Sequence, residues 1–440
     1  MNEVAEIEAR RDVDVDAAGT PPRGARLVRL PRRMRFLTYL AIAGPGLIAA
    51  NAGNDAGGIA TYASAGSQYR YRTLFFMVLV TVGLIVVQEM SARLGTFTGK
   101  GLAALIREQF SLRLAGLALG CLILANFGLV ISEFAGIGAA LELVGVTRYV
   151  SIPIAAVAIW ALVLFGSYRY AERVFLILSL AFFAYPVAAI LGHPDWAQVG
   201  SQTVLPHFVA SKSFVFLGVA LIGTTISPYM QLYAAAGVVD RGIAPEEYHL
   251  ERIDAVGGAV FASVISMFMI IATAAAIGGT GPLNSAAEAA RALRPVAGSA
   301  AELLFCVGLL GASMLAGAVV PLSTSYAVSE AVGVERSVSR RFREAPLFLG
   351  LFSLQVLVGA AVALTPVNLI RLLIGTQVLQ GLITPIILAF ILVLANRRSV
   401  LGAAANGRVF RKVAAGAVLC VAALSILLLA QTVLGWFGLG

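Results

Sequence analysis

Long runs of apolar residues constrain the fold of this chain more than any other feature. The stretches 73–88 and 413–437 contain no charged residue, and similar stretches follow one another between them. A helix needs about 20 residues to cross the hydrocarbon core of a bilayer. Hydrophobic residues make up 59% of the 440 residues and charged residues 12%, against about 25% charged in soluble proteins. We therefore expect an all-α membrane protein whose outer surface faces lipid.

The apolar runs predict eleven membrane-spanning helices. Their expected bounds are 37–64, 73–92, 114–144, 150–166, 174–191, 213–236, 254–278, 298–325, 346–363, 368–394 and 413–436. Most lysine and arginine residues then fall in the N-terminal segment and in every second loop. Because basic loops stay on the cytoplasmic side, we expect a cytoplasmic N-terminus and an external C-terminus. The expected location is the plasma membrane of a prokaryote.

Two of the expected spans contain residues that interrupt a helix. The first reads Asn-Ala-Gly-Asn-Asp-Ala-Gly-Gly over residues 51–58, with Asp55 near its centre. Glycine, asparagine and aspartate are poor helix formers. The sixth span contains Pro228, which lacks an amide hydrogen and clashes with the preceding turn. Freed backbone groups at bilayer depth must face protein or a wet cavity, so each break marks a candidate site.

The two breaks occupy corresponding positions in two groups of five spans. This pattern is typical of inverted-repeat transporters, in which the substrate binds between the breaks. We therefore expect a LeuT/APC-like fold of eleven transmembrane helices with an inverted 5+5 repeat and discontinuous helices 1 and 6. The expected parts are a disordered cytoplasmic tail (1–35), the repeat core (36–395, with halves 36–192 and 212–395), and a loop with helix 11 (396–440).

A small set of polar residues in the spans is available for cation binding. An ionisable residue inside a membrane is costly and marks function by default, although Asp55 could also cap the second half of its helix. Glu133 in the third span, and Gln377 and Gln380 in the tenth, could equally be links between helices. Oxygen donors suit hard divalent cations. The candidate metal ligands are Asp55, Asn54, Thr224, Ser227 and Gln377, and Glu133 and Gln380 are candidates for a gate or polar network.

The chain resembles the NRAMP divalent-metal transporters at four motifs in the same order. The family's Asp-Pro-Gly-Asn stands here as Asp55-Ala56-Gly57-Gly58, and its Ala-x-x-Met-Pro-His stands as residues 224–229, from Thr224 to Tyr229. Ser132-Glu133 is similar to the family's Ala-Glu pattern, and Gln377-Val378 to its Gln-Val pair. The resemblance implies divalent-cation transport by alternating access and adds Gly58 to the metal site.

The departures from the family pattern concern the metal site and proton coupling. Ser227 stands in place of the family's metal-binding methionine, and Tyr229 in place of a histidine tied to proton coupling. These changes are similar to the NRAMP-related magnesium transporters, which implies Mg2+ transport, with Mn2+ also carried and without protons. Tyr229 then joins the candidate gate or polar network.

Three other functions are weaker readings of the same residues. A proton-coupled Mn2+ or Fe2+ symporter has the same architecture, but Ser227 and Tyr229 favour the magnesium branch. An amino acid or a Na+-coupled substrate is a second alternative, although Asp55 favours a cation. An intramembrane enzyme would need a nucleophile–base pair or a metal triad, and neither motif occurs. Nucleic acid is excluded as a partner because the basic residues sit in short loops, and we expect no cofactor and no obligate protein partner.

Overall fold

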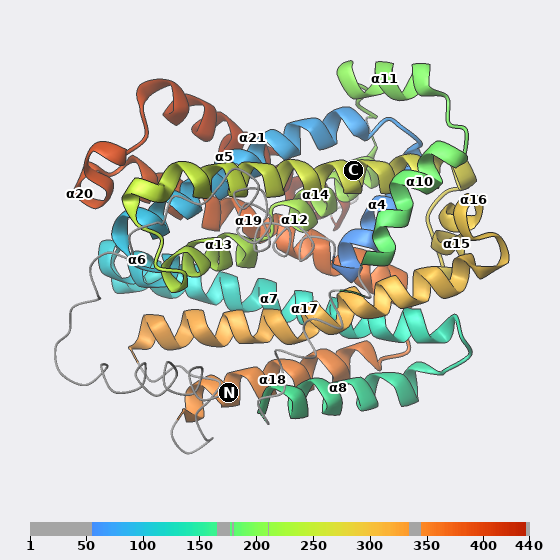
Figure 1. The fold of residues 1–440 in the computed structure, drawn as a ribbon, viewed down its shortest axis with the longest axis horizontal. Coiled ribbons are helices and arrows are strands. Elements are labelled where there is room, and N and C mark those ends of the chain that lie inside the picture. The colour runs from blue at the N-terminus through green and yellow to red at the C-terminus, as the bar shows by residue number, and fades with distance from the viewer. Residues whose placement is uncertain (1–54, 165–176, 178–179, 210, 334–344, 437–440) are drawn as a thin grey trace, which may run out of the picture. The chain divides into compact units, whose positions relative to one another are not determined.

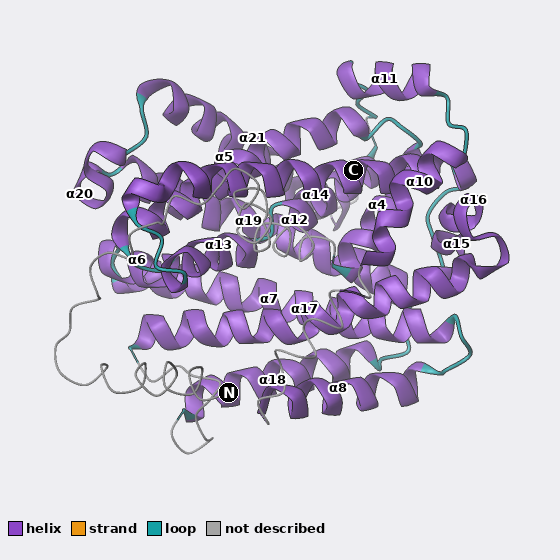
Figure 2. Cartoon of the chain, in the orientation of Figure 1, coloured by secondary structure: helices purple, strands orange, loops and turns teal. Residues whose placement is uncertain are grey.

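The structure is a computed structural model, and it describes residues 55–164, 177, 180–209, 211–333 and 345–436. The described residues form helices joined by short loops and contain no strand (Figure 2). The elements, in order, are α4 (Ala56–Tyr69), α5 (Leu74–Thr98), α6 (Leu102–Gln109), α7 (Leu112–Glu142), α8 (Arg148–Leu164), η1 (Leu180–Phe183), α10 (Ala184–Leu191), α11 (Trp196–Val204), α12 (Lys212–Thr225), α13 (Pro228–Asp240), η2 (Pro245–Glu247), α14 (Tyr248–Ile277), α15 (Ala286–Ala290), η3 (Arg291–Leu293), α16 (Arg294–Ala297), η4 (Gly298–Ala300), α17 (Ala301–Val332), α18 (Pro346–Ala363), α19 (Leu369–Asn396), α20 (Arg398–Leu401), η5 (Gly402–Ala404) and α21 (Arg408–Trp436).

Long helices lie side by side through most of this part of the chain (Figure 1). Helix α7 packs against α17, α18, α19 and α8, and α14 packs against α4 and α5. The shorter helices α12 and α13 follow one another and both contact α19. Helix α4 is therefore enclosed by α7, α12, α14 and α19, all of which contact it.

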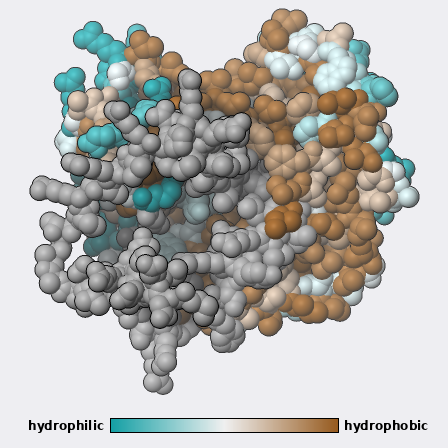
Figure 3. Space-filling model, in the orientation of Figure 1, coloured by the Kyte–Doolittle hydropathy of each residue, from teal (hydrophilic) through white to brown (hydrophobic). Residues whose placement is uncertain are grey.

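The outward-facing side chains of these helices are largely apolar. Leu112 is 85% exposed, and Leu357 and Leu419 are each 67% exposed. Among the described residues, eight helical segments are long and apolar enough to cross a membrane, with α12 and α13 taken together as one, and α8 is a shorter apolar helix. Hydrophobic side chains also cover much of the visible described surface (Figure 3). This pattern confirms an all-helical membrane protein, while the count of eleven spans and the orientation stay predictions.

Several helices extend beyond the bounds that hydropathy predicts. Helix α5 runs to Thr98 instead of residue 92, α14 begins at Tyr248 instead of 254, and α17 runs to Val332 instead of 325. Neighbouring protein buries the end of α5 over residues 91–96, whereas His249, Arg252 and Ile253 at the start of α14 are exposed. In α5, Arg93 lies 3.1 Å from Glu89, and Glu89 also accepts a hydrogen bond from Tyr248.

The predicted break in the sixth span is confirmed. Helix α12 ends at Thr225 and α13 begins at Pro228, with Ile226 in a non-helical conformation (φ −115°, ψ 52°) between them. The Ser227 hydroxyl donates to the carbonyls of Gly223 (2.7 Å) and Thr224 (3.2 Å), which have lost their helical partners at the break. In the first span, α4 begins at Ala56. The first part of that span, with Asn54, lies outside the described residues, as does the expected N-terminal tail.

Glycine permits the close crossing of α12 and α19. A Cβ on Gly223 would overlap the carbonyl oxygen of Gln377, and a Cβ on Gly381 would overlap the carbonyl oxygen of Val219. Small residues let membrane helices approach backbone to backbone. This crossing sets the position of Gln377 relative to the break in α12.

We expect Gly223→Ala to destabilise the protein by about 1–3 kcal/mol, the usual cost of overpacking a core. The added methyl group meets backbone atoms that cannot rotate away. The measurement is the unfolding midpoint of the purified protein in detergent. Gly350→Ala is the matched control, because a Cβ at this other helical glycine meets no atom within 4 Å. Equal midpoints for the two variants would contradict the proposed crossing.

Candidate functional site

Asp55 caps the N-terminus of α4 in the protein interior. Its side chain is 1% exposed, and its Oδ1 atom accepts a hydrogen bond from the amide of Gly58 at 2.5 Å. The Asp55 carbonyl accepts from Ile59 at 3.0 Å and so begins the helical ladder. An N-cap carboxylate satisfies a free amide and interacts favourably with the positive end of the helix dipole. The capping role expected from the sequence is thus confirmed.

A second carboxylate lies at the same helix end. Glu133 of α7 is fully buried, and its Oε2 atom accepts from the amide of Ala56 at 3.4 Å. The other oxygen, Oε1, has no hydrogen-bond partner in the described part of the chain. The first turn of α4 therefore holds two carboxylates, one from its own cap and one from a neighbouring helix.

Gln377 and Thr224 bring two further helices to Asp55. Gln377 of α19 donates from Nε2 to Asp55 Oδ1 at 3.4 Å. Thr224, at the end of α12, places its hydroxyl beside Gly58, because Thr224 Oγ1 and Asp55 Oδ1 lie 2.5 and 3.0 Å from the point that a Cβ on Gly58 would occupy. The structure thus brings together four predicted site residues: Asp55, Gly58, Thr224 and Gln377.

Gly58 contributes its amide and its lack of a side chain. A side chain at position 58 would enter the space that the Thr224 hydroxyl fills. Gly57 acts in the same way on the other side, since a Cβ there would overlap the amide of Gln377. The two glycines therefore let α12 and α19 present polar groups directly to the cap of α4.

Several oxygens of this cluster have no hydrogen-bond partner among the described residues. They are Asp55 Oδ2, Thr224 Oγ1 and the amide oxygen of Gln377, and all three residues are buried. A buried polar atom without a partner costs about 1–3 kcal/mol. A carboxylate, a hydroxyl and an amide oxygen are the donor types that a hard divalent cation binds. Within the described residues, no three histidine, cysteine, aspartate or glutamate side chains gather anywhere, so a metal site here must use neutral oxygens as well.

The remaining predicted residues are placed as follows. Ser227 is buried at the break, where its hydroxyl donates to carbonyls of its own helix. Tyr229 is buried in the first turn of α13. Gln380 is fully buried one turn after Gln377, and neither side-chain polar atom has a partner in the described chain. Asn54 lies outside the described residues.

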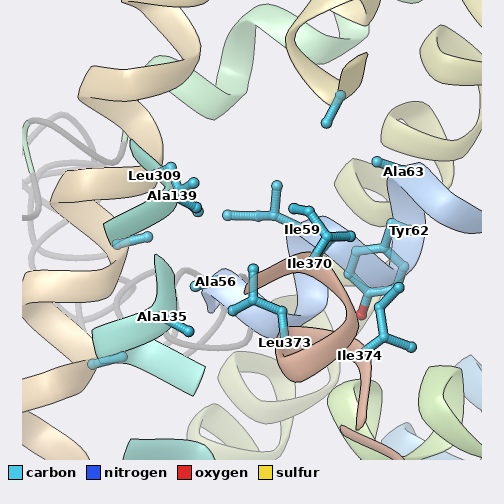
Figure 4. Close-up of a cluster of buried hydrophobic side chains, with 14 of the residues drawn as sticks. Ala56, Ile59, Tyr62, Ala63, Ala135, Ala139, Leu309, Ile370, Leu373 and Ile374 are labelled. Atoms are coloured by element: carbon cyan, nitrogen blue, oxygen red, sulfur yellow. The ribbon is translucent and has the colours of Figure 1, made fainter. Parts of the chain in front are cut away.

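The sequence prediction missed Tyr62, which links the two interrupted spans. Its hydroxyl lies 3.0 Å from Thr225 Oγ1, at the end of α12. Tyr62 follows Asp55 by seven residues, about two helical turns, so the two share a face of α4. That spacing was the available signal. Beside it, Ala56, Ile59 and Ala63 of α4 lie in an apolar cluster with residues of α7 and α19 (Figure 4).

The end of α4 is also fixed. Ser67 donates from its hydroxyl to the carbonyl of Gly281 at 2.6 Å, and its own carbonyl accepts from the amide of Gly279 at 2.7 Å. Helix α4 is thus held at its last turns by the loop after α14 and at its first turn by Glu133 and Gln377.

Comparison with known proteins gives consistent matches over most of the chain. The family described as natural resistance-associated macrophage protein-like (Nramp) matches residues 46–431. The chain is 27% identical to the divalent metal cation transporter MntH of Acidiphilium cryptum, over 95% of this chain and 97% of that protein. It is 28% identical to the protein of the same name from Deinococcus radiodurans, over 88% and 87% of the two chains.

Solved structures share the fold. A crystal structure of the Eremococcus coleocola manganese transporter aligns with a TM-score of 0.75 and 21% identity, covering 97% of this chain and 92% of that one. The nucleobase-cation-symport-1 family transporter Mhp1 aligns with a TM-score of 0.52 and 15% identity, over 88% and 92%. The LeuT-like fold expected from the two broken helices is therefore confirmed.

The contact between position 58 and Thr224 generates a double-variant prediction. Gly58→Asn alone should weaken the binding of a divalent cation, with Mn2+ as the probe, about 10-fold or more, because its side chain overlaps the Thr224 hydroxyl. Thr224→Ala alone removes one candidate ligand and should weaken binding less. The double variant removes the overlap and adds the side-chain oxygen of asparagine in place of the Thr224 hydroxyl. Its affinity for the cation should therefore exceed that of Gly58→Asn. Titration calorimetry of the purified protein measures all three affinities, and simple additivity would contradict the shared space.

Proposed function

Since this chain belongs to the natural resistance-associated macrophage protein-like (Nramp) family, we propose that it carries a divalent metal cation across the membrane through a site centred on Asp55. One observation supports this site above all: α4, α12 and α19 meet at a buried carboxylate whose neighbouring hydroxyl and amide oxygens have no hydrogen-bond partner in the described part of the chain. The chain is a membrane transporter of this family and not an enzyme.

The cation-binding step follows from the two oxygens of Asp55. Oδ1 is engaged by Gly58 and Gln377, which fix the carboxylate, and Oδ2 remains available. A cation at Oδ2 would take further oxygens from Thr224 and Gln377, in exchange for some of its water. The negative charge of Asp55 offsets part of the charge of a divalent ion, and the nearby Glu133 carboxyl offsets more of it when ionised, which lowers the cost of holding the ion in a medium of low dielectric constant.

Alternating access is supported by the way the helices are broken. Helices α12 and α13 are separate segments joined at Ile226 and Ser227. Because no helical hydrogen bond has to break at this junction, one segment can tilt while the other stays packed. In discontinuous-helix transporters, the two repeats rock against each other around a fixed site of this kind.

Mn2+ is the cargo that the relatives support, since their names specify manganese or divalent metal cations. Mg2+ is a second candidate cargo, because the candidate ligands are all oxygen donors. The donors at the break are oxygens of Asp55, Thr224, Ser227 and Gln377, with no sulfur between them. Such a set of ligands gives no preference for softer metals over Mg2+. Transport of Mg2+, as the sequence predicts, therefore remains a hypothesis beside transport of Mn2+.

Proton coupling is a separate part of the proposal, and Glu133 and Tyr229 are the residues concerned. The replacement of the family's histidine by Tyr229 favours transport without protons. Glu133 accepts from the amide of Ala56 with one oxygen, and its other oxygen has no partner among the described residues. It is the residue that would carry a proton in a proton-coupled symporter.

Asp55→Asn separates the two roles of this residue. Asparagine caps a helix about as well as aspartate, so folding should be retained while the charge is lost. We expect Mn2+ uptake into liposomes to fall to background, with the unfolding midpoint little changed. Asp195→Asn is the matched control, because Asp195 also caps a helix, α11, through the amide of Gln198 at 3.0 Å. Uptake at the wild-type rate in Asp55→Asn would reduce Asp55 to a helix cap.

Ion competition with a pH-sensitive dye tests cargo and coupling together. Liposomes containing the wild-type protein are loaded with a dye for Mn2+ or for protons, and Mg2+ is added outside at increasing concentration. We expect Mg2+ to slow Mn2+ uptake and the lumen to keep its pH. Acidification that accompanies Mn2+ entry, with no effect of Mg2+, would favour the proton-coupled manganese alternative.

A further inference from the structure

Ser132 carries a buried hydroxyl that the proposed function does not use. The residue is fully buried in the middle of α7, and its Oγ atom has no hydrogen-bond partner among the described residues. Some buried helical serines donate to the carbonyl four residues earlier, as Ser266 does at 3.0 Å and Ser325 at 2.8 Å, whereas Ser132 is one of several whose hydroxyl has no partner among the described residues. The Ser132 hydroxyl therefore makes no hydrogen bond to its own helix, and its position beside Gly57 decides what it can bind.

That hydroxyl faces the candidate cation site. Ser132 Oγ lies 2.6 Å from the point that a Cβ on Gly57 would occupy, and Gln377 Cδ lies 2.7 Å from the same point. The amide of Gln377 in turn reaches Asp55 at 3.4 Å. Ser132, Gln377 and Asp55 thus lie around the first turn of α4, and the missing side chain of Gly57 lets Ser132 and Gln377 approach it closely.

We propose that Ser132 is a specificity-determining residue, whose hydroxyl binds a water molecule of the divalent cation held at Asp55. This inference rests on the proposed function and deepens it. A hydroxyl can both donate to and accept from water. A bridging water spans gaps too wide for a direct hydrogen bond and contributes almost as much as one.

The consequence is a preference between cations. Mg2+ dehydrates reluctantly and keeps several waters when it binds to proteins. A cation that keeps its water gains from a hydroxyl in the outer layer of the site, whereas a cation bound directly by Asp55, Thr224 and Gln377 gains little. Ser132 therefore favours the more hydrated ion, on the α7 side of the site.

The test measures Mg2+ competition against Mn2+ uptake in liposomes for Ser132→Ala and Ser132→Thr. For Ser132→Ala, we expect the Mg2+ concentration that halves Mn2+ uptake to rise about 5- to 10-fold, as one lost hydrogen bond predicts. Mn2+ uptake without Mg2+ should change less than about 3-fold. Ser132→Thr keeps the hydroxyl and should restore competition. Ser325→Ala, which removes a buried hydroxyl bound to its own helix, is the control and should match wild type.

Each other outcome overturns the inference in a recognisable way. Equal losses for Mg2+ and Mn2+ in Ser132→Ala would mean a structural role, and unchanged competition would mean no contact with the hydrated ion. A wild-type protein that carries Mn2+ but is indifferent to Mg2+ overturns the inference and leaves the proposed function standing. A wild-type protein that carries neither cation overturns both. If Ser132→Ala does not fold, Ser132→Cys keeps the volume and weakens the hydrogen bond, so the same shift is expected.

Discussion

The structure depends on the way the N-terminus of α4 is held inside the protein. A helix that begins at bilayer depth exposes free amides and a positive dipole end where no solvent can satisfy them. Two carboxylates satisfy these amides: Asp55 accepts from Gly58, and Glu133 accepts from Ala56. The positive end of the helix dipole in turn stabilises the two buried carboxylates. The residues that begin α4 are therefore also those of the candidate cation site. A substitution that affects one role affects the other.

Small residues around this helix end bring the other donors within reach. Gly57 and Gly58 leave space for Gln377 and Thr224, and Gly223 lets α12 cross α19 at the carbonyl of Gln377 itself. Packing of this kind is rigid, because the contacts at the crossing involve backbone atoms. The position of the Gln377 amide thus follows from a backbone contact between helices and does not depend on the side chain alone.

The sequence predicted the features that depend on local chemistry. The cap at Asp55, the break before Pro228 and the apolar outer face follow from the residues nearby, and all three are present. Features that depend on distant contacts were not predictable in this way. Glu133 meets α4 across 77 residues of chain, Tyr62 meets Thr225 only after the helices pack, and residues 91–96 at the end of α5 are buried by neighbouring protein. Ser132 was visible only as the neighbour of Glu133.

Ser227 shows how one side chain can connect metal choice with backbone chemistry. Its hydroxyl donates hydrogen bonds to the carbonyl oxygens of Gly223 and Thr224. Those oxygens lie at the C-terminal end of α12, where the helix dipole gives them partial negative charge. A residue without a donor at position 227 would release both oxygens beside the site. The end of α12 would then offer its main chain as additional ligands, whatever the new side chain contributed. The residue at position 227 therefore determines how many backbone oxygens are free to bind a cation, as well as which side-chain atom is available there.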